Sequence, residues 1–180
     1  KDTGFAGLPE RTKGTFEDLW QPGFTPPGAF AQLGAAYAAR IATITTEPEM
    51  PKAKARRLDR ASQFAVVAVT RCLAEAGWTM AGNEEETGIL LGTGSAGASP
   101  LVELERQMAV ESPEAASPFL FPNTVANAPA SQTALELRIK GPNVTITQKD
   151  PATLNALFYA RLLLWDGKAD AALVGSADEW

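Results

Sequence analysis

The sequence predicts an α/β fold with a largely parallel sheet, and three observations support this prediction. Residues 87–94 and 170–176 contain apolar runs bounded by glycine, as is typical of strands that are covered on both faces of a sheet. A third strand is predicted within 141–146, where Val144 and Ile146 alternate with polar residues. Helical segments separate these strands along the chain, and strands that alternate with helices favour parallel pairing.

The composition limits the size of the core and the kinds of partner. The chain has 180 residues and is 45% apolar, so it can bury one sizeable core. Its net charge of −5, with acidic and basic residues interspersed, argues against nucleic acid and against an anionic membrane surface as partners. No apolar run approaches the roughly 20 residues that a membrane-spanning helix needs. The polar start also lacks the apolar region of a signal peptide.

Cysteine and histidine usage limits the chemistry. Cys72 is the only cysteine, so no internal disulfide can form, and we expect a reducing, cytoplasmic environment. Cys72 lies between Val69 and Ala76 in a helical segment, and we expect it to be a small core residue. The sequence contains no histidine, which excludes metal–histidine sites and Ser–His or Cys–His pairs within this chain. We expect no metal site.

Residues 1–51 are predicted to wrap around the surface of a domain that begins at residue 52. Residues 1–35 are rich in glycine and proline and are predicted to be loops, whereas the alanine-rich segment 31–44 is predicted to be helical. Pro48 and Pro51 then break the chain before the next helix. The sequence starts at a lysine and ends at Trp180, directly after an apolar run, so we expect a part of a longer gene product.

The strongest helical pattern covers residues 52–77, with Gly77 as its cap. Its first turns are basic, and this cluster is either a solvated face or a surface that binds an anion. The basic residues are Lys52, Lys54, Arg56, Arg57 and Arg60. The glycine-serine loop after the strand at 87–94 resembles a phosphate cradle only loosely, because it lacks the lysine of a P-loop and the spacing of a dinucleotide fingerprint.

Two helices follow the strand at 87–94, and the loop between them contains several prolines. The first helix is predicted from Pro100 to Met108, and the second has Pro129 in its first turn and ends at Lys140-Gly141. The loop at 112–122 contains three consecutive apolar residues, Phe119, Leu120 and Phe121. We expect these apolar side chains to be buried, either in the core of this chain or against a partner.

The stretch from residue 141 to residue 155 is predicted to run from strand through turn to helix. The turn reads Thr147-Gln148-Lys149-Asp150-Pro151, and the following helix has Leu154, Leu157, Phe158, Arg161 and Leu162 at helical spacing. We expect Asp150 to cap this helix, with Pro151 at its first position. A helix N-terminus carries free N–H groups and partial positive charge, so this turn is also suited to a nucleophile or an anion.

Four segments, in the same order, resemble the β-ketoacyl synthases of the thiolase-like superfamily. They are residues 55–78, 88–97 (GILLGTGSAG), 121–142 and 141–179, the last containing GPNVTI and ADAALVGSADE. The resemblance covers about two-thirds of the chain and implies the thiolase-like layered fold, of which residues 52–180 are the N-terminal half. It also implies an acyl carrier protein as partner, its phosphopantetheine thioester as substrate without a further cofactor, and assembly into a homo- or heterodimer.

The sequence departs from this family at the nucleophile. Counting back from Leu154, or forward from Gly141-Pro142, the place of the family's cysteine is Asp150. A carboxylate is a poor substitute for a thiolate, and its acyl anhydride is labile. Non-condensing relatives, such as chain-length factors and loading-module decarboxylases, carry glutamine at this place, but Gln148 is offset from it by two residues. The resemblance further implies an acyl pocket that includes Gln148, Lys149, Asn127 and Ala128, and Ala128 is too small to restrict access to it.

Three functions remain open at this point. The first is a non-condensing synthase-like subunit that pairs with an active synthase and shapes the acyl pocket. The second is a thioester-binding decarboxylase or acyltransferase that a C-terminal half completes, with N–H groups at the helix N-terminus as the oxyanion hole. The third is a purely structural partner that kept the fold, because fold does not dictate function.

Overall fold

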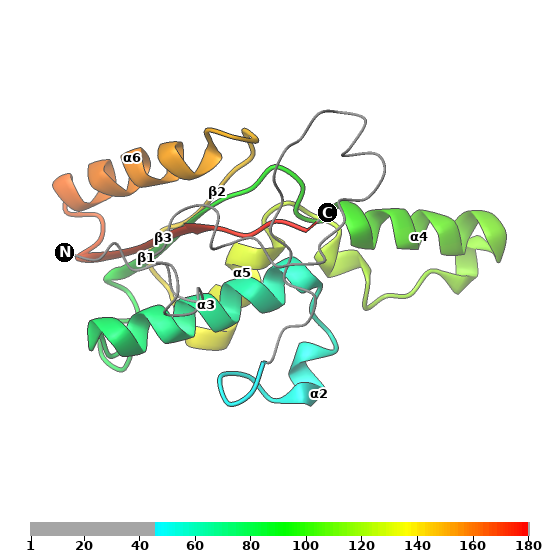
Figure 1. Cartoon of the computed structure of the whole chain (residues 1–180), viewed down its shortest axis with the longest axis horizontal. Coiled ribbons are helices and arrows are strands. Elements are labelled where there is room, and N and C mark those ends of the chain that lie inside the picture. Colours follow the sequence, from blue (N-terminus) through cyan, green and yellow to red (C-terminus); the bar gives the residue numbers. More distant parts are fainter. Residues whose placement is uncertain (1–45, 180) are drawn as a thin grey trace, which may run out of the picture. The chain divides into compact units, whose positions relative to one another are not determined.

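The structure is a computed structural model that describes residues 46–179, and its elements carry the labels of Figure 1. The elements are α2 (Lys52–Ala55), α3 (Arg60–Ala76), β1 (Thr87–Gly92), α4 (Ala98–Val110), the 3₁₀ turns η3 (Pro113–Ala115) and η4 (Phe121–Asn123), α5 (Ala128–Leu137), β2 (Asn143–Ile146), α6 (Ala152–Trp165) and β3 (Ala171–Ser176). The helix predicted at 31–44 and most of the segment 1–51 lie outside the described residues.

The three described strands form a parallel sheet in the order β2-β1-β3, which confirms the predicted α/β class. In the central strand β1, Leu90 pairs with Val144 of β2 on one side and with Val174 of β3 on the other. Each return to a parallel strand needs a crossover, and the helices α4, α5 and α6 lie in these crossovers. Because all strands run the same way, their carboxyl ends meet at one edge of the sheet.

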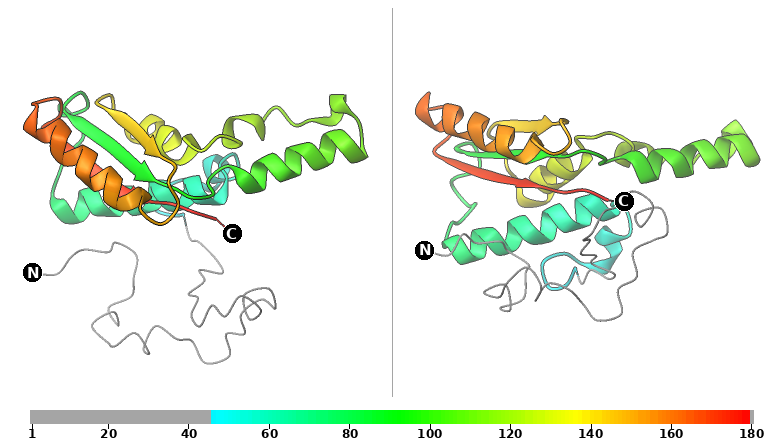
Figure 2. Two further views of the ribbon diagram at one scale, coloured as in Figure 1. Left: turned by 90° about the horizontal axis from the view of Figure 1, so that it is seen from above. Right: turned by 45° about the horizontal axis from the view of Figure 1, so that its top comes forward.

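Helices cover both faces of the sheet (Figures 1 and 2). Leu90 points to the face covered by α6 and packs with Ala156 and Ala160, whereas Ile89 and Leu91 point to the face covered by α3 and α5. Every residue of β1 is buried, as its uninterrupted apolar pattern predicts. The core of the described part therefore lies on both sides of this one strand.

The helix α6 packs against the sheet with a face that the leucine pattern did not indicate. Its buried residues are Ala152, Ala156 and Ala160, spaced four apart, while Leu154 is 71% exposed and Phe158 is 54% exposed. The close approach of the helix explains this, because a Cβ atom on Gly92 would lie 2.5 Å from the backbone nitrogen of Thr153. At such a distance only alanine fits against the sheet, so the large apolar side chains of α6 point outward.

The single helix predicted at 52–77 is wrong, because the chain breaks at residues 56–59 between α2 and α3. Asp59 is extended, with ψ 166°, and the side chain of Gln63 donates hydrogen bonds to the carbonyl oxygens of Ala55 (2.9 Å) and Leu58 (3.0 Å). The bond to Leu58 satisfies a carbonyl group that the break leaves without a helical partner, whereas the carbonyl oxygen of Ala55 also accepts from the backbone N–H of Leu58 (3.1 Å). The end of α3 is as predicted, with Gly77 in the left-handed region at φ 65°.

Two further expectations are corrected. Cys72 is exposed, because the buried positions of α3 near it are Val69 and Leu73. The helix α5 ends at Leu137, with Arg138 in the left-handed region at φ 58°, rather than at residues 140–141. Among the described residues, no helix is both long and apolar enough to cross a bilayer.

Candidate functional site

Three loops meet at the carboxyl edge of the sheet, one after each strand. The backbone N–H of Thr93, after β1, donates to the carbonyl oxygen of Ile146 at the end of β2 (2.9 Å). A Cβ atom on Gly94 would lie 3.2 Å from the Cα atom of Lys149, so the two backbones touch with no side chain between them. In parallel α/β sheets this edge is the usual place for a ligand or an active site.

The loop after β1 is bound by a carboxylate from the loop after β3. One oxygen of Asp178 accepts hydrogen bonds from the hydroxyl of Thr93 (2.6 Å) and the backbone N–H groups of Gly94 (2.9 Å) and Ser95 (2.8 Å). The N–H groups that could have cradled a phosphate therefore already bind a residue of this chain. Asp178 was not among the predicted site residues, although its place directly after the predicted strand at 170–176 could have indicated it.

The loop after β2 contains Asp150, the residue at the predicted nucleophile position. Lys149 has φ 50°, which is uncommon for a residue with a side chain, and the N–H of Ala152 donates to its carbonyl oxygen (3.0 Å). This tight turn delays the start of α6 to Ala152, with Pro151 at the N-cap position and no side-chain capping bond. The expectation that Asp150 caps the helix is therefore wrong, and Asp150 lies exposed beside the helix start.

Gln148 is attached to the same helix by its side chain. The amide nitrogen of Asn155, in the first turn of α6, donates a short hydrogen bond to the side-chain oxygen of Gln148. Gln148, Lys149 and Asp150 thus lie together in one exposed turn, as predicted, with the glutamine oriented toward the helix.

The structure places the other two predicted pocket residues at the start of α5. Ala128 is buried with 2% of its surface exposed, and the side chain of Asn127 donates to the hydroxyl of Ser131 (3.4 Å). A Cβ atom on Gly97 would lie 2.8 Å from the backbone of Thr124, so the segment before α5 borders the loop after β1. No hydrogen bond within residues 46–179 links Asn127 to the Asp150 turn, and their membership of one acyl pocket stays a prediction.

An apolar groove of about 600 Å³ begins one helical turn beyond Asp150 and lies between α6 and β3. Its lining comes from α6 and β3 and consists of Leu154, Leu157, Phe158, Ala160, Arg161, Leu164, Ala172 and Val174. The only charged lining residue is Arg161, whose guanidinium lies 5.5 Å from the ring centre of Trp165. The groove offers apolar contacts and almost no hydrogen bonds, so it suits an aliphatic chain or further protein.

A second cavity, of about 350 Å³, lies between the basic segment and α4. Arg56 and Arg57 contribute to one wall, and Glu103 and Gln107 contribute to another. Within the described part of the chain, neither of these two arginines makes an ion pair. Both are exposed, so two cationic groups are free to bind an anion at the cavity.

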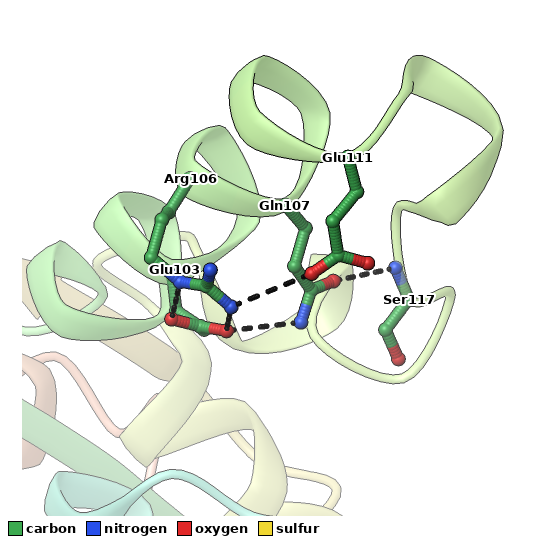
Figure 3. Close-up of polar contacts among 5 residues, drawn as sticks. All are labelled: Glu103, Arg106, Gln107, Glu111 and Ser117. Atoms are coloured by element: carbon green, nitrogen blue, oxygen red, sulfur yellow. Dashed lines mark hydrogen bonds and ion pairs between the residues drawn. The ribbon is translucent and has the colours of Figure 1, made fainter.

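The α4 wall of this cavity is a hydrogen-bonded cluster (Figure 3). Arg106 binds both oxygens of Glu103 (2.8 and 2.9 Å), and this pairing lowers the pKa of Glu103 to about 2. Gln107 donates to Glu103 (3.1 Å) and accepts from the backbone N–H of Ser117 (3.0 Å). The cluster thereby ties α4 to the loop that carries the three consecutive apolar residues.

The described part of the chain does not bury that apolar segment. Phe119 is 69% exposed and Phe121 is 66% exposed. Two covers were possible for these phenylalanines, the core of this chain or a partner, and the core of residues 46–179 is excluded. The same part of the chain contains no group of three or more acidic, cysteine or histidine residues that could hold a metal ion.

Comparison with known proteins identifies the family. The family model for the N-terminal domain of β-ketoacyl synthases matches residues 31–179. The 3-oxoacyl-(acyl-carrier-protein) synthase 2 of Synechocystis sp. is 28% identical over 173 residues, which are 91% of this chain and 42% of that protein. The enzyme of the same name from Rhizobium meliloti is 27% identical over 138 residues, or 76% of this chain and 33% of that protein.

Solved structures agree with this assignment. The ishigamide ketosynthase/chain length factor superposes with a TM-score of 0.66 and 29% identity, over 78% of this chain and 40% of that one. A type II polyketide ketosynthase in complex with its acyl-carrier protein has a TM-score of 0.70 at 20% identity, over 77% of this chain and 40% of that one, and it supports the fold. The chain spans about two-fifths of the length of these structures. The protein belongs to the β-ketoacyl synthase family, of which this chain contains the N-terminal domain.

Proposed function

We propose that this chain is part of a β-ketoacyl synthase-like subunit of fatty-acid or polyketide biosynthesis that does not itself condense acyl groups. The observation that carries the proposal is Asp150, which occupies the turn between β2 and α6 where family members that condense have cysteine. The only sulfur nucleophile of the chain, Cys72, lies on α3, on the opposite face of the sheet from α6.

The chemistry of the carboxylate explains the expected lack of condensation. In a condensing enzyme a thiolate attacks the acyl thioester, the carrier thiol leaves, and the acyl group remains on the enzyme as a new thioester. Attack by the Asp150 carboxylate would instead give a mixed anhydride, which water hydrolyses readily. The exposed position of Asp150 gives water access, so we expect that no acyl group accumulates on this subunit.

Intact-mass spectrometry tests this proposal directly. The full-length protein is incubated with an acyl carrier protein loaded with a stable acyl group, and an active synthase with its cysteine serves as the positive control. We expect the synthase to gain the mass of the acyl group and this protein to gain none. A stable acyl adduct on this protein would refute the non-condensing role.

We further propose an acyl carrier protein as the partner of the basic cavity. Arg56 and Arg57 are exposed and make no ion pair within residues 46–179, and a carrier protein presents acidic side chains and a phosphate on its prosthetic arm. Replacing both arginines by alanine should weaken carrier binding at least about tenfold and flatten its salt dependence. Lys168→Ala, on an exposed turn away from the cavity, is the matched control and should leave binding unchanged.

The subunit is proposed to act in a cytoplasmic heterodimer with an active synthase. A subunit without a nucleophile can contribute to condensation only through a partner that has one, and the exposed Phe119 and Phe121 offer apolar contacts for that partner. We expect co-expression with a cysteine-bearing synthase to give a heterodimer on size-exclusion chromatography. The Phe119→Ser, Phe121→Ser variant should shift the complex toward monomers, and an unchanged elution would contradict this interface.

Carbon dioxide release distinguishes the decarboxylase alternative. Incubation with a malonyl-loaded carrier protein should release no carbon dioxide above the background of the carrier alone. Release that depends on Asp150 would replace the proposed role with decarboxylation.

A further inference from the structure

Asp178 makes several hydrogen bonds across the carboxyl edge of the sheet. Its Oδ1 accepts from the Thr93 hydroxyl, from the N–H groups of Gly94 and Ser95, and from the Ser95 hydroxyl (3.1 Å). The N–H of Gly94 also approaches Oδ2 (3.2 Å). These partners lie 83 to 85 residues away in the sequence, so one carboxylate fixes the loop after β1 relative to the end of β3.

The loop that Asp178 fixes is the surface against which the Asp150 turn packs. A Cβ atom on Gly94 would lie 3.2 Å from the Cα atom of Lys149, and one on Gly92 would lie 2.5 Å from the nitrogen of Thr153. Backbone therefore contacts backbone on both sides of Asp150. Lys149 also has a left-handed backbone, a conformation that persists in a non-glycine residue when its surroundings hold it.

We propose that Asp178 is a positioning residue that sets the direction of Asp150, acting through Gly94 and Lys149. The assignment of Asp150 as the acyl site rests on the proposed function, whereas the mechanical link rests on the contacts above. Removal of the Asp178 acceptor would release the loop after β1, and the Asp150 turn would lose the surface that holds Lys149 in its left-handed conformation. The rest of the sheet would remain paired, because Asp178 lies beyond the last residue of β3.

Hydrogen exchange in the full-length protein, resolved by peptide, tests the mechanical link. In Asp178→Ala we expect the amides of residues 147–153 to exchange about tenfold faster, while peptides from α3 and from the body of β1 keep their rates. Asp178→Asn retains an acceptor oxygen and should show a smaller increase. Asp170→Ala, an exposed aspartate at the opposite end of β3, is the matched control and should behave as wild type.

A thiol probe reports the geometry at residue 150 itself. In a Cys72→Ser background, Asp150→Cys introduces the only thiol within residues 1–180, and peptide-resolved mass spectrometry follows its alkylation by iodoacetamide, whose pH profile depends on its position at the start of α6. Asp178→Ala and Asp178→Asn remove the same charge, so a difference between their profiles isolates the hydrogen bonds. We expect the profile of the alanine variant to differ more from that of wild-type Asp178.

The outcomes separate the two proposals. Exchange that rises uniformly over all peptides, or that does not change at residues 147–153, would overturn the positioning role. Identical alkylation profiles for the alanine and asparagine variants would do the same. Neither readout depends on acyl transfer, so the positioning role can fail while the non-condensing function stands, and an acyl adduct on the wild-type protein would refute the function alone.

Discussion

Asp59, at the N-cap position of α3, carries a carboxyl group that is largely removed from water. Burial raises its pKa above the ordinary value of 3.8, and neither carboxylate oxygen has a hydrogen-bond partner among the described residues. Between the ordinary and the raised pKa, the folded protein binds a proton more readily than the unfolded chain does. The contribution of Asp59 to the free energy of unfolding therefore falls as the pH rises through this window.

This pH dependence of the free energy of unfolding predicts the effect of Asp59→Asn. The amide cannot ionise, and Asp59 makes no side-chain capping bond that the substitution could lose, so the variant should be more stable than wild type at pH 7. The gain should shrink at a pH near 3.8, where the wild-type carboxyl is protonated. Urea unfolding of both proteins at the two pH values measures the difference, and a gain that is equal at both would contradict the explanation by burial.

At the residue scale, the sequence predicted the turn that contains Asp150 but not the geometry of that turn. The sequence predicted Asp150 in the turn between the strand that ends at Ile146 and the following helix, and the structure confirms this position. The left-handed backbone of Lys149 and the bonds of Asp178 were not predictable, because both depend on loops that are distant in the sequence and meet only when the parallel strands pair. The prediction that Asp150 caps α6 was wrong for the same reason.

At the scale of elements, the contact between β1 and α6 depends on a glycine. A Cβ atom on Gly92 would lie 2.5 Å from a backbone nitrogen of α6, which no side-chain rotation can relieve. Gly92→Ala should therefore reduce the free energy of unfolding by about 1–3 kcal/mol through overpacking. Gly175→Ala, in the neighbouring strand, is the control, because its Cβ would lie 3.8 Å from Leu91.

Urea unfolding of the two alanine variants measures this difference. Equal stability of the two would show that α6 can move away from the sheet at no cost. A loss in Gly92→Ala alone would show that the close packing of α6 contributes to stability.

The strands were more predictable than the helices, for a physical reason. An uninterrupted apolar run such as that of β1 has one plausible environment, a sheet covered on both faces, and the structure confirms it. A helix that is apolar on several sides, such as α6, does not show which side meets the sheet. The leucines suggested one face, but the distance to Gly92 admits only the alanines. Similarly, the break between α2 and α3 depends on Gln63 and was hidden by continuous helical periodicity.

At the scale of the molecule, the outer face of α6 leaves a large apolar surface on the described part. Leu154, Leu157 and Phe158 are all more than half exposed, and they line the groove of about 600 Å³. The relative from Synechocystis sp. is matched over only 42% of its length. We expect further protein to cover this apolar face in the full-length protein.

Leu157→Glu in the full-length protein tests this cover. A charge buried without a partner should cost more than about 3 kcal/mol, whereas Lys168→Glu on an exposed turn should change the stability by less than about 0.5 kcal/mol. Thermal and urea unfolding measure both. Equal, small effects of the two substitutions would mean that the outer face of α6 stays in contact with water.

The central claim is that the turn between β2 and α6 is an acyl site that lacks only its sulfur nucleophile. The most direct measurement is the intact mass of the full-length Asp150→Cys, Cys72→Ser variant after incubation with an acyl-loaded carrier protein, beside Cys72→Ser alone. We predict a stable acyl adduct on the introduced thiol and none on the protein that retains Asp150. An adduct on the protein with Asp150 would contradict this claim. An introduced thiol that reacts with iodoacetamide but never accepts the acyl group would contradict it as well.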